Sequence, residues 1–275
     1  MVNCARVNGR GIFCLAVVLL SASPLPAALG RRSARPSNGS SKISLRKRLH
    51  INTLITEPGS VELDWGGLYS FTSTEFAMPS AFRYTPSGSN VLWGRTEYSV
   101  TFDSLASSDA GGSRLTQFSQ AVTLAGTAVL HDGDKLDIAI APQASIFLRD
   151  ESGARVGVVA IARYDSGRNS TGFTASWSGA THSSDNNPAG TFDAGFGYGR
   201  QLSGSPLLEK FTPHFNAEWE RSTGSPSVAL VFEGFEYQIT EKLAFDLGGQ
   251  HTATRGASPD HQLAFGMTLR LGHSR

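Results

Sequence analysis

The feature that most constrains the fold is a two-residue alternation of apolar and polar side chains, which recurs along almost the whole chain after residue 60. Successive side chains in a β-strand point to opposite faces, so each such run predicts a strand with one apolar and one polar face. Gly, Pro, Asn, Asp and Ser separate the runs. Twelve runs are predicted, at residues 61–73, 76–85, 91–104, 114–130, 136–148, 154–165, 170–180, 191–201, 211–222, 227–239, 243–254 and 261–271.

Two places depart from this regular pattern. The Ser- and Gly-containing stretch Leu105–Ser113 reads as a loop. In the run 227–239, the apolar residues occupy even-numbered positions in the first half and odd-numbered positions in the second half. A bulge near Glu233-Gly234 would bring both halves onto one face, and we therefore predict one there.

The number and length of the runs predict the fold class. An even number of strands allows a sheet to close with both chain ends on the same side. Most runs hold about 10–14 residues, slightly more than the roughly 9–11 that a tilted spanning strand needs. No run shows a sustained helical period, and none reaches the roughly 18 apolar residues of a spanning helix. We predict an all-β protein, a closed antiparallel transmembrane β-barrel of about twelve strands, in residues 61–275.

Alternation alone fits a soluble barrel or sandwich equally well, and the lysines help to distinguish these folds. After residue 60 the only lysines are Lys135, Lys210 and Lys242, and all three fall at predicted turns. A sheet face in water normally carries several lysines, whereas the polar face here is mostly Ser, Thr, Gly, Ala, Gln and Arg/Glu pairs, which suits a crowded lumen. Aromatic residues near the run ends are candidates for interfacial girdles: Trp65, Tyr69, Phe71, Tyr84, Trp93, Tyr164, Tyr198 and Trp219.

Residues 1–30 have the pattern of a secretory signal peptide. Arg6 and Arg10 precede the apolar centre Gly11–Leu20, which is too short to span a bilayer as a helix. Both cysteines, Cys4 and Cys14, lie in this segment. Its removal would leave a protein without a disulfide or a thiolate metal site.

Residues 31–60 form a basic, flexible N-terminal segment rich in Ser, Pro and Asn. Its acidic content is Glu57 alone, against seven basic residues: Arg31, Arg32, Arg35, Lys42, Arg46, Lys47 and Arg48. After residue 60 the balance reverses, to 15 Lys/Arg and 22 Asp/Glu. In an exported protein this segment is either a solvated tail near anionic lipid or a piece tucked into the barrel mouth, and we expect no nucleic-acid partner.

Loop lengths predict which end of the barrel faces which compartment. With the N-terminus in the periplasm, short turns fall on the periplasmic side and longer loops outside, as outer-membrane barrels require. The short turns are His131–Lys135, Ser166–Asn169 and Thr240–Lys242, and the long outer loops are Leu105–Ser113 and Thr181–Gly190. Leu202–Lys210 is a long exception on the periplasmic side, and Thr74-Glu75 is a short one outside.

The last run, His261–Leu271, resembles the final strand of outer-membrane β-barrels, although it ends on Leu271 rather than on an aromatic residue. Thr56–Trp65, Phe235–Asp246 and Asp260–Leu271 also resemble outer-membrane proteins of the MetA-pathway of phenol degradation type, which are related in architecture to hydrocarbon-transport barrels. That resemblance implies passive passage or binding of small, hydrophobic molecules across the cell outer membrane. The implied partners are outer-membrane lipid, such solutes, and the barrel-assembly machinery, which would contact Leu263–Leu271.

The charged residues on the polar face are the candidate site. They are the lumen-lining candidates Arg95, Glu97, Asp103, Arg155, Arg163, His214, Glu218, Glu220 and Arg270. Their mixed signs argue against strong ion selectivity, and a structural network of ion pairs that fills the lumen explains them equally well.

No catalytic residue, metal or cofactor is expected. His182–Asp185 contains a His and two Ser side by side in a polar loop, without a nucleophile-elbow pattern. Asp132, Asp134 and Asp137 lack the further ligands of a calcium loop. A non-conducting structural or adhesive barrel is the alternative function, and a lipid-hydrolysing barrel is a third.

Overall fold

The computed structural model describes residues 55–56, 58–71, 76–87, 95–110, 113–117, 121–148, 153–183, 188–254 and 261–272. For 103–110 and 113–117 only the backbone is described. The predicted signal peptide and residues 31–54 of the basic segment therefore lie outside the described residues. Within the described part, the chain contains no helix of sufficient length and hydropathy to cross a membrane.

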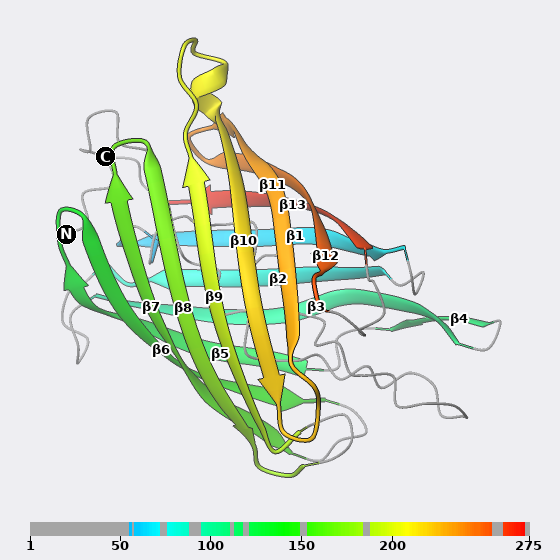
Figure 1. Cartoon of the computed structure of the whole chain (residues 1–275). Helices are drawn as coiled ribbons and strands as arrows, with labels where there is room; N and C mark the ends of the chain where they lie inside the picture. The colour runs from blue at the N-terminus through cyan, green and yellow to red at the C-terminus, as the bar shows by residue number, and fades with distance from the viewer. Residues whose placement is uncertain are drawn as a thin grey trace.

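The described residues form thirteen strands, which make up a single antiparallel sheet (Figure 1). The strands are β1 Ser60–Ser70, β2 Phe76–Thr85, β3 Thr96–Ala110, β4 Ser113–Gln117, β5 Ala121–Asp132, β6 Leu136–Phe147, β7 Ala154–Ser166, β8 Asn169–Ala180, β9 Gly190–Arg200, β10 Phe211–Ser222, β11 Val228–Thr240, β12 Leu243–Thr252 and β13 His261–Leu271. The first strand pairs with both β2 and β13, and β2 pairs with β3. Because β4 pairs with β3 alone, twelve strands form the closed barrel, as predicted.

The β3–β4 hairpin corrects the predicted loop at 105–113. Strand β3 continues to Ala110, and it pairs first with β2, at Ala77↔Ala106, and then with β4, at Ala110↔Ser113. Pairing with two neighbours overrides the weak strand preference of Ser and Gly. The run predicted at 114–130 is correspondingly divided between β4 and β5.

The predicted bulge at Glu233-Gly234 is wrong. Both ladders of β11 run through Gly234 without interruption, opposite His214 on one side and Gly248 on the other, and the irregularity in β11 lies between Gln238 and Thr240. Strand β11 therefore turns an apolar side chain, Phe232, to the interior and a carboxylate, Glu233, to the exterior.

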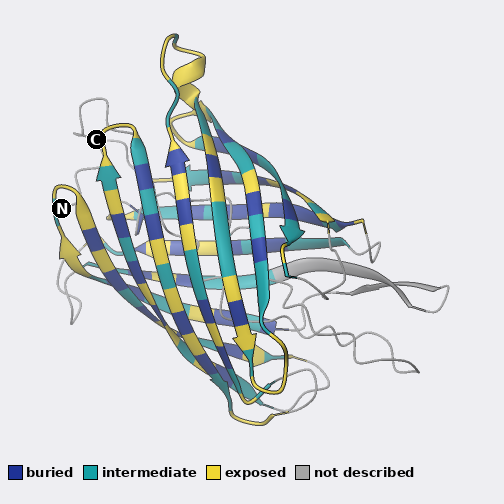
Figure 2. Cartoon of the chain, in the orientation of Figure 1, coloured by how far each residue is buried: buried dark blue, intermediate teal, exposed yellow. Residues whose placement is uncertain are grey.

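Burial alternates along nearly every strand (Figure 2), and the exposed positions of the alternation are predominantly apolar. Phe173 is 52% exposed and Trp177 is 54% exposed, whereas their neighbour Ser176 is buried. Exposed apolar side chains around a closed barrel would be unfavourable in water and are favourable against lipid. The orientation predicted from the lysines is consistent with this pattern, since Lys135, Lys210 and Lys242 all lie at chain reversals rather than within strands.

Two rims bound this apolar belt. We call the rim at which β1 begins and β13 ends the terminal end, and the other rim the far end. Tyrosines gather near the terminal end at outward positions: Tyr84, Tyr98, Tyr164, Tyr198 and Tyr237. Toward the far end the corresponding residues are Tyr69, Phe71, Trp177, Phe192 and Trp219. These two groups have the arrangement of interfacial girdles; Trp93 lies outside the described residues.

The predicted short turns lie at one end of the barrel, together with one of the two exceptions that the sequence showed; the other, Thr74-Glu75, lies outside the described residues. The turns between β5 and β6, β7 and β8, and β11 and β12 are short and lie together at the terminal end. The long connection Leu202–Lys210 lies at the same end and contains a 3-10 turn, Leu208–Lys210, which gives it local structure.

Candidate functional site

Most of the charged residues predicted to line the lumen face the barrel interior. Glu97, Arg155, Arg163, His214 and Glu220 are buried there, and Glu218 and Arg270 are half-buried at inward positions. Arg95 lies at the terminal rim, where its Nη1 is 2.8 Å from Asp132 Oδ2. The side chain of Asp103 lies outside the described atoms, although its backbone pairs with Pro79.

The interior also holds charged residues that the sequence reasoning missed: Glu62, Asp64, Arg83, Asp137, Asp193, Glu236 and Asp246. Glu62 and Asp64 alternate with Val61, Leu63 and Trp65, so the same two-residue rule identifies them. Glu236 alternates with Phe235 and Tyr237, so the same rule identifies it too.

The seam between the first and last strands is held by a cluster of ion pairs. Arg83 of β2 donates from Nη1 to Glu62 Oε1 at 2.7 Å and from Nη2 to Asp64. Arg270 of β13 donates to the other oxygen of Glu62 at 2.8 Å, and Thr268 donates to Asp64 Oδ1 at 2.7 Å. Each carboxylate thus receives donors from both neighbouring strands, which ties the chain ends together inside the wall.

A second arginine cluster lies on the opposite part of the terminal end. Arg163 Nη2 is 2.8 Å from Asp137 and 2.7 Å from Asp165. Together with the Arg95–Asp132 pair, these contacts use two of the three aspartates weighed above for calcium. Among the described residues, no group of three or more His, Cys, Asp or Glu side chains is placed to hold a metal ion.

Near the far end, a chain of polar contacts runs along the inner wall from β7 to β10. Arg155 donates to the Pro188 carbonyl at 2.7 Å and to Thr191 Oγ1 at 3.2 Å. The Thr191 hydroxyl lies 3.0 Å from that of Ser222, which donates to Glu220 at 3.3 Å. One guanidinium therefore serves several strands, and its charge acts on both Asp193 and Glu220.

Strands β10 to β12 carry a different arrangement, which we call the acidic wall. Glu218, Glu236 and Asp246 face inward from it, and Glu236 lies directly opposite Asp246 in the β11–β12 ladder. In the described parts of β9–β12, no Lys or Arg occupies an inward position, since Arg200 and Arg221 face outward. This wall therefore has a net negative charge.

Two apolar patches interrupt the polar interior. One consists of Ala139, Ala141, Val159 and Ile161 on β6 and β7. The other consists of Leu68, Phe232 and Ala264, with Ala77 packed against them. The Phe232 ring also stacks on His214, with ring centroids 5.6 Å apart and planes 13° apart. Because β6–β7 and β11–β1 are separated by about half the ring of strands, the patches lie on opposite walls.

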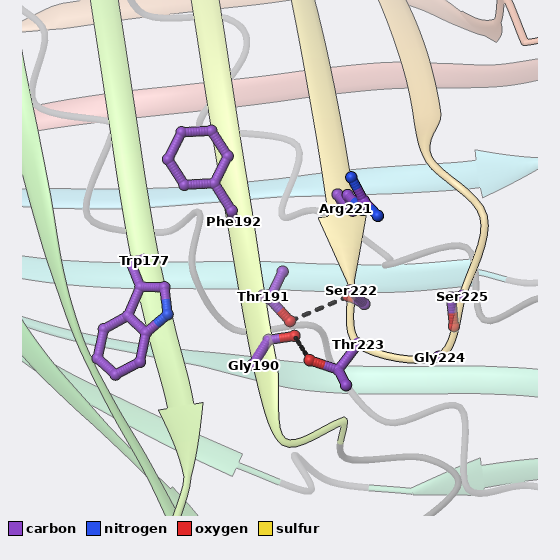
Figure 3. Close-up of a pocket in the computed structure, with 9 residues that line it drawn as sticks. All are labelled: Trp177, Gly190, Thr191, Phe192, Arg221, Ser222, Thr223, Gly224 and Ser225. Atoms are coloured by element: carbon purple, nitrogen blue, oxygen red, sulfur yellow. Dashed lines mark hydrogen bonds between the residues drawn. The ribbon is translucent and has the colours of Figure 1, made fainter.

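A pocket of about 560 Å³ opens at the far end, outside this interior (Figure 3). Trp177, Phe192 and Arg221 line it from outward positions, beside the loop that contains Thr223. Thr223 Oγ1 donates to the Gly190 carbonyl at 3.1 Å and so ties the β10–β11 loop to β9. The pocket is a feature of the rim, and the charged groups with buried partners lie in the barrel interior.

A closed antiparallel barrel with an apolar belt, two aromatic rims and a charged interior defines the class of outer-membrane β-barrel proteins. The chain has this fold and belongs in the cell outer membrane. No known protein-family model matches the sequence, and no curated protein does.

Solved structures of outer-membrane channels are similar to this barrel. The COG4313 outer membrane channel from Pseudomonas putida F1 matches with a TM-score of 0.57 at 9% identity, over 78% of this chain and 97% of that one. The NanC porin matches with a TM-score of 0.55 at 10% identity, over 76% and 100% of the two chains. The KdgM porin matches with a TM-score of 0.51 at 6% identity, over 76% and 98%. At these identities the likeness establishes the shared fold.

Proposed function

We propose that the chain is a passive outer-membrane channel for small hydrophobic molecules, of the MetA-pathway of phenol degradation type. The observation that carries the proposal is the pair of apolar patches on opposite inner walls. If the interior side chains served only the stability of the barrel, ion pairs and small polar side chains would be enough to fill it. The patch side chains face inward but are buried, with 0–7% of their surface exposed, so they offer a solute dispersion contacts where neighbouring interior side chains move aside.

The sign of the interior charge favours the passage of neutral solutes over the passage of acidic ones. One KdgM structure is described as a complex with oligogalacturonate, an acidic oligosaccharide. Here Glu218, Glu236 and Asp246 give one wall a negative charge, which repels anions. A neutral aromatic alcohol meets no such charge barrier.

The test is single-channel recording on purified protein in planar bilayers, with phenol or galacturonate added. We expect a stable ion conductance that phenol interrupts and galacturonate does not. Leu68→Ala should weaken the phenol effect because Leu68 belongs to an inner patch. Leu63→Ala is the matched control, since Leu63 lies on the same strand at an outward position.

The result that would overturn the proposal differs for each alternative function. Absence of any conductance would favour a structural or adhesive barrel. Interruption by galacturonate alone would retain the channel and reject the hydrophobic solute. Release of fatty acid from phospholipid by the purified protein would favour the enzyme.

A further inference from the structure

Two arginines face outward among the strand residues whose side chains are described, and they lie at opposite rims: Arg200 at the terminal end and Arg221 at the far end. The acidic residues beside Arg221 are Glu220 on the same strand and Asp193 on β9, and both are buried on the inner side of the wall. The Arg221 guanidinium therefore places its positive charge on the side that faces the membrane, at the edge of the apolar belt. A cation in this place attracts anionic groups of the surrounding lipid.

Arg221 ends a row of large side chains that crosses three neighbouring strands on the outer surface (Figure 3). Trp177 of β8 lies directly opposite Phe192 of β9, and Phe192 lies directly opposite Arg221 of β10. Side chains in such positions have Cβ atoms about 4.5–5.5 Å apart, so the three groups are neighbours. Trp177 and Phe192 are 54% and 42% exposed, and the ring centroids of Phe192 and Trp219 are 5.9 Å apart. The row joins an exposed aromatic surface to a cation.

The pocket beside this row is open because Gly190, at the start of β9, has no side chain. A side chain there would begin 3.3 Å from Thr223 Oγ1 and 3.9 Å from Trp177 Nε1. The Thr223 hydroxyl donates to the Gly190 carbonyl and so fixes the loop that forms one side of the pocket. Ser225 of the same loop brings a second hydroxyl, and Arg221 lines the same pocket. A guanidinium, an indole N–H and a hydroxyl around one concave space suit an anion with several acceptor oxygens.

We propose that this pocket binds the phosphate headgroup of an anionic lipid, with the Arg221 guanidinium on the phosphate and an acyl chain against Trp177 and Phe192. Arginine binds phosphate through two parallel N–H···O bonds, which are strong and directional. The pocket volume of about 560 Å³ lies within the roughly 300–1,000 Å³ of small-ligand sites. With the orientation predicted from the loop lengths, this lipid belongs to the outer leaflet. The inference concerns the outer surface of the barrel and does not depend on the proposed channel function.

The surroundings of the pocket favour a lipid over a free phosphate ion. A free ion would use only Arg221 and the donors of the pocket. A lipid also covers the exposed rings of Trp177 and Phe192, which belong to the far-end girdle where headgroups meet the apolar belt. The aromatic row therefore adds apolar contact that only a molecule with an acyl chain gains.

The test follows the fluorescence of Trp177 in vesicles that contain brominated lipid, because bromine quenches an indole only at close approach. The reporter protein carries Trp65→Phe, Trp93→Phe and Trp219→Phe, so that Trp177 is its one remaining tryptophan. Brominated phosphatidic acid should quench it several-fold more strongly than brominated phosphatidylcholine at the same mole fraction. Unbrominated phosphatidic acid should relieve that quenching. Equal quenching by the two brominated lipids would overturn the inference.

Variants of the two outward arginines locate the phosphate contact. Arg221→Gln should abolish the preference for phosphatidic acid. Arg221→Lys should retain part of it, because an ammonium keeps the charge but loses the two-pronged geometry. Arg200→Gln is the matched control, since it removes the outward arginine of the opposite rim, and it should leave the preference unchanged. A preference that survives Arg221→Gln would contradict the assignment of the phosphate to Arg221.

Two further variants separate the pocket from the effect of charge alone. Gly190→Val fills the space beside Thr223 while keeping Arg221, and it should lose the preference. Ser225→Leu fills the pocket from an exposed loop, outside the strand ladders, and should act in the same way even where Gly190→Val folds poorly. An undiminished preference in Ser225→Leu would show that charge alone attracts the lipid and would overturn the pocket. Loss of the wild-type preference on addition of inorganic phosphate would assign the site to the free ion and overturn the lipid.

Discussion

The inner walls built by β1–β3 and by β10–β12 use carboxylates in opposite ways. On the first wall, Glu62 and Asp64 both receive the Arg83 guanidinium, and Glu62 also receives Arg270. On the second, Glu236 faces Asp246 across a ladder whose strands supply no inward Lys or Arg in their described parts. The first wall pairs two of its carboxylates with arginines of adjacent strands, whereas the second sets two carboxylates directly opposite each other.

This difference between the two walls distinguishes the part of the interior that holds the barrel closed from the part that is available for function. Ion pairs with several hydrogen bonds, such as those of Arg83, fix the seam that closes the barrel. Like charges directly opposite each other in a ladder cost stability. Closure of the barrel is therefore expected to depend on the seam, and selection of solutes by charge on the acidic wall.

Arg83→Ala should give the largest effect. It would leave Glu62 and Asp64 buried with fewer donors, and breaking a buried ion pair from one side costs about 3–5 kcal/mol. Folded and unfolded barrels migrate differently on a detergent gel, and the variant should shift to the unfolded position after heating to a lower temperature than the wild type needs. Arg221→Ala is the matched control, because Arg221 faces outward at the rim. Equal migration profiles of the two variants would show that the seam does not depend on Arg83.

Glu233→Leu should give a smaller effect of opposite sign. Glu233 is exposed at an outward position between Phe215 and Gly249, within the apolar belt. Replacing a lipid-facing carboxylate should raise the free energy of unfolding by about 1–2 kcal/mol, measured by urea unfolding in vesicles. Glu241→Leu, at the exposed β11–β12 turn, should change it little. A destabilised Glu233→Leu variant would assign Glu233 a stabilising partner in the membrane.

Alternation in the sequence was sufficient to predict most of the barrel. The runs at 76–85, 211–222 and 261–271 coincide with β2, β10 and β13, and the twelve-strand closure follows from their number. These strands separate apolar from polar side chains cleanly, so two-residue periodicity and the observed register agree. Serine-rich strand β3 was partly missed, because its extension to Ala110 depends on pairing with neighbours rather than on its own composition.

The site was less predictable than the fold for a reason that β11 makes clear. Phe232 faces inward and Glu233 outward, which inverts the usual barrel pattern at that strand. A bulge was the simplest way to restore the pattern from sequence, and it concealed the inward position of Phe232. An apolar patch inside the lumen forms only when β11 meets Leu68 and Ala264, which are distant in sequence. The local periodicity of the sequence does not show which distant strands pack against each other.

Glu236→Gln should give the smallest effect. The substitution removes the repulsion with Asp246, directly opposite in the β11–β12 ladder, and should raise the free energy of unfolding by about 0.2–1 kcal/mol. Urea unfolding of the wild type and the variant in vesicles measures this difference.

Gln250→Ala is the control, since Gln250 is an uncharged inward residue of β12, and it should bring no such gain. A Glu236→Gln variant that is less stable than the wild type would show that the interactions of Glu236 with its other neighbours stabilise the barrel by more than its repulsion with Asp246 costs. The contrast between the two walls would then lie in the arrangement of their carboxylates and not in their contribution to stability.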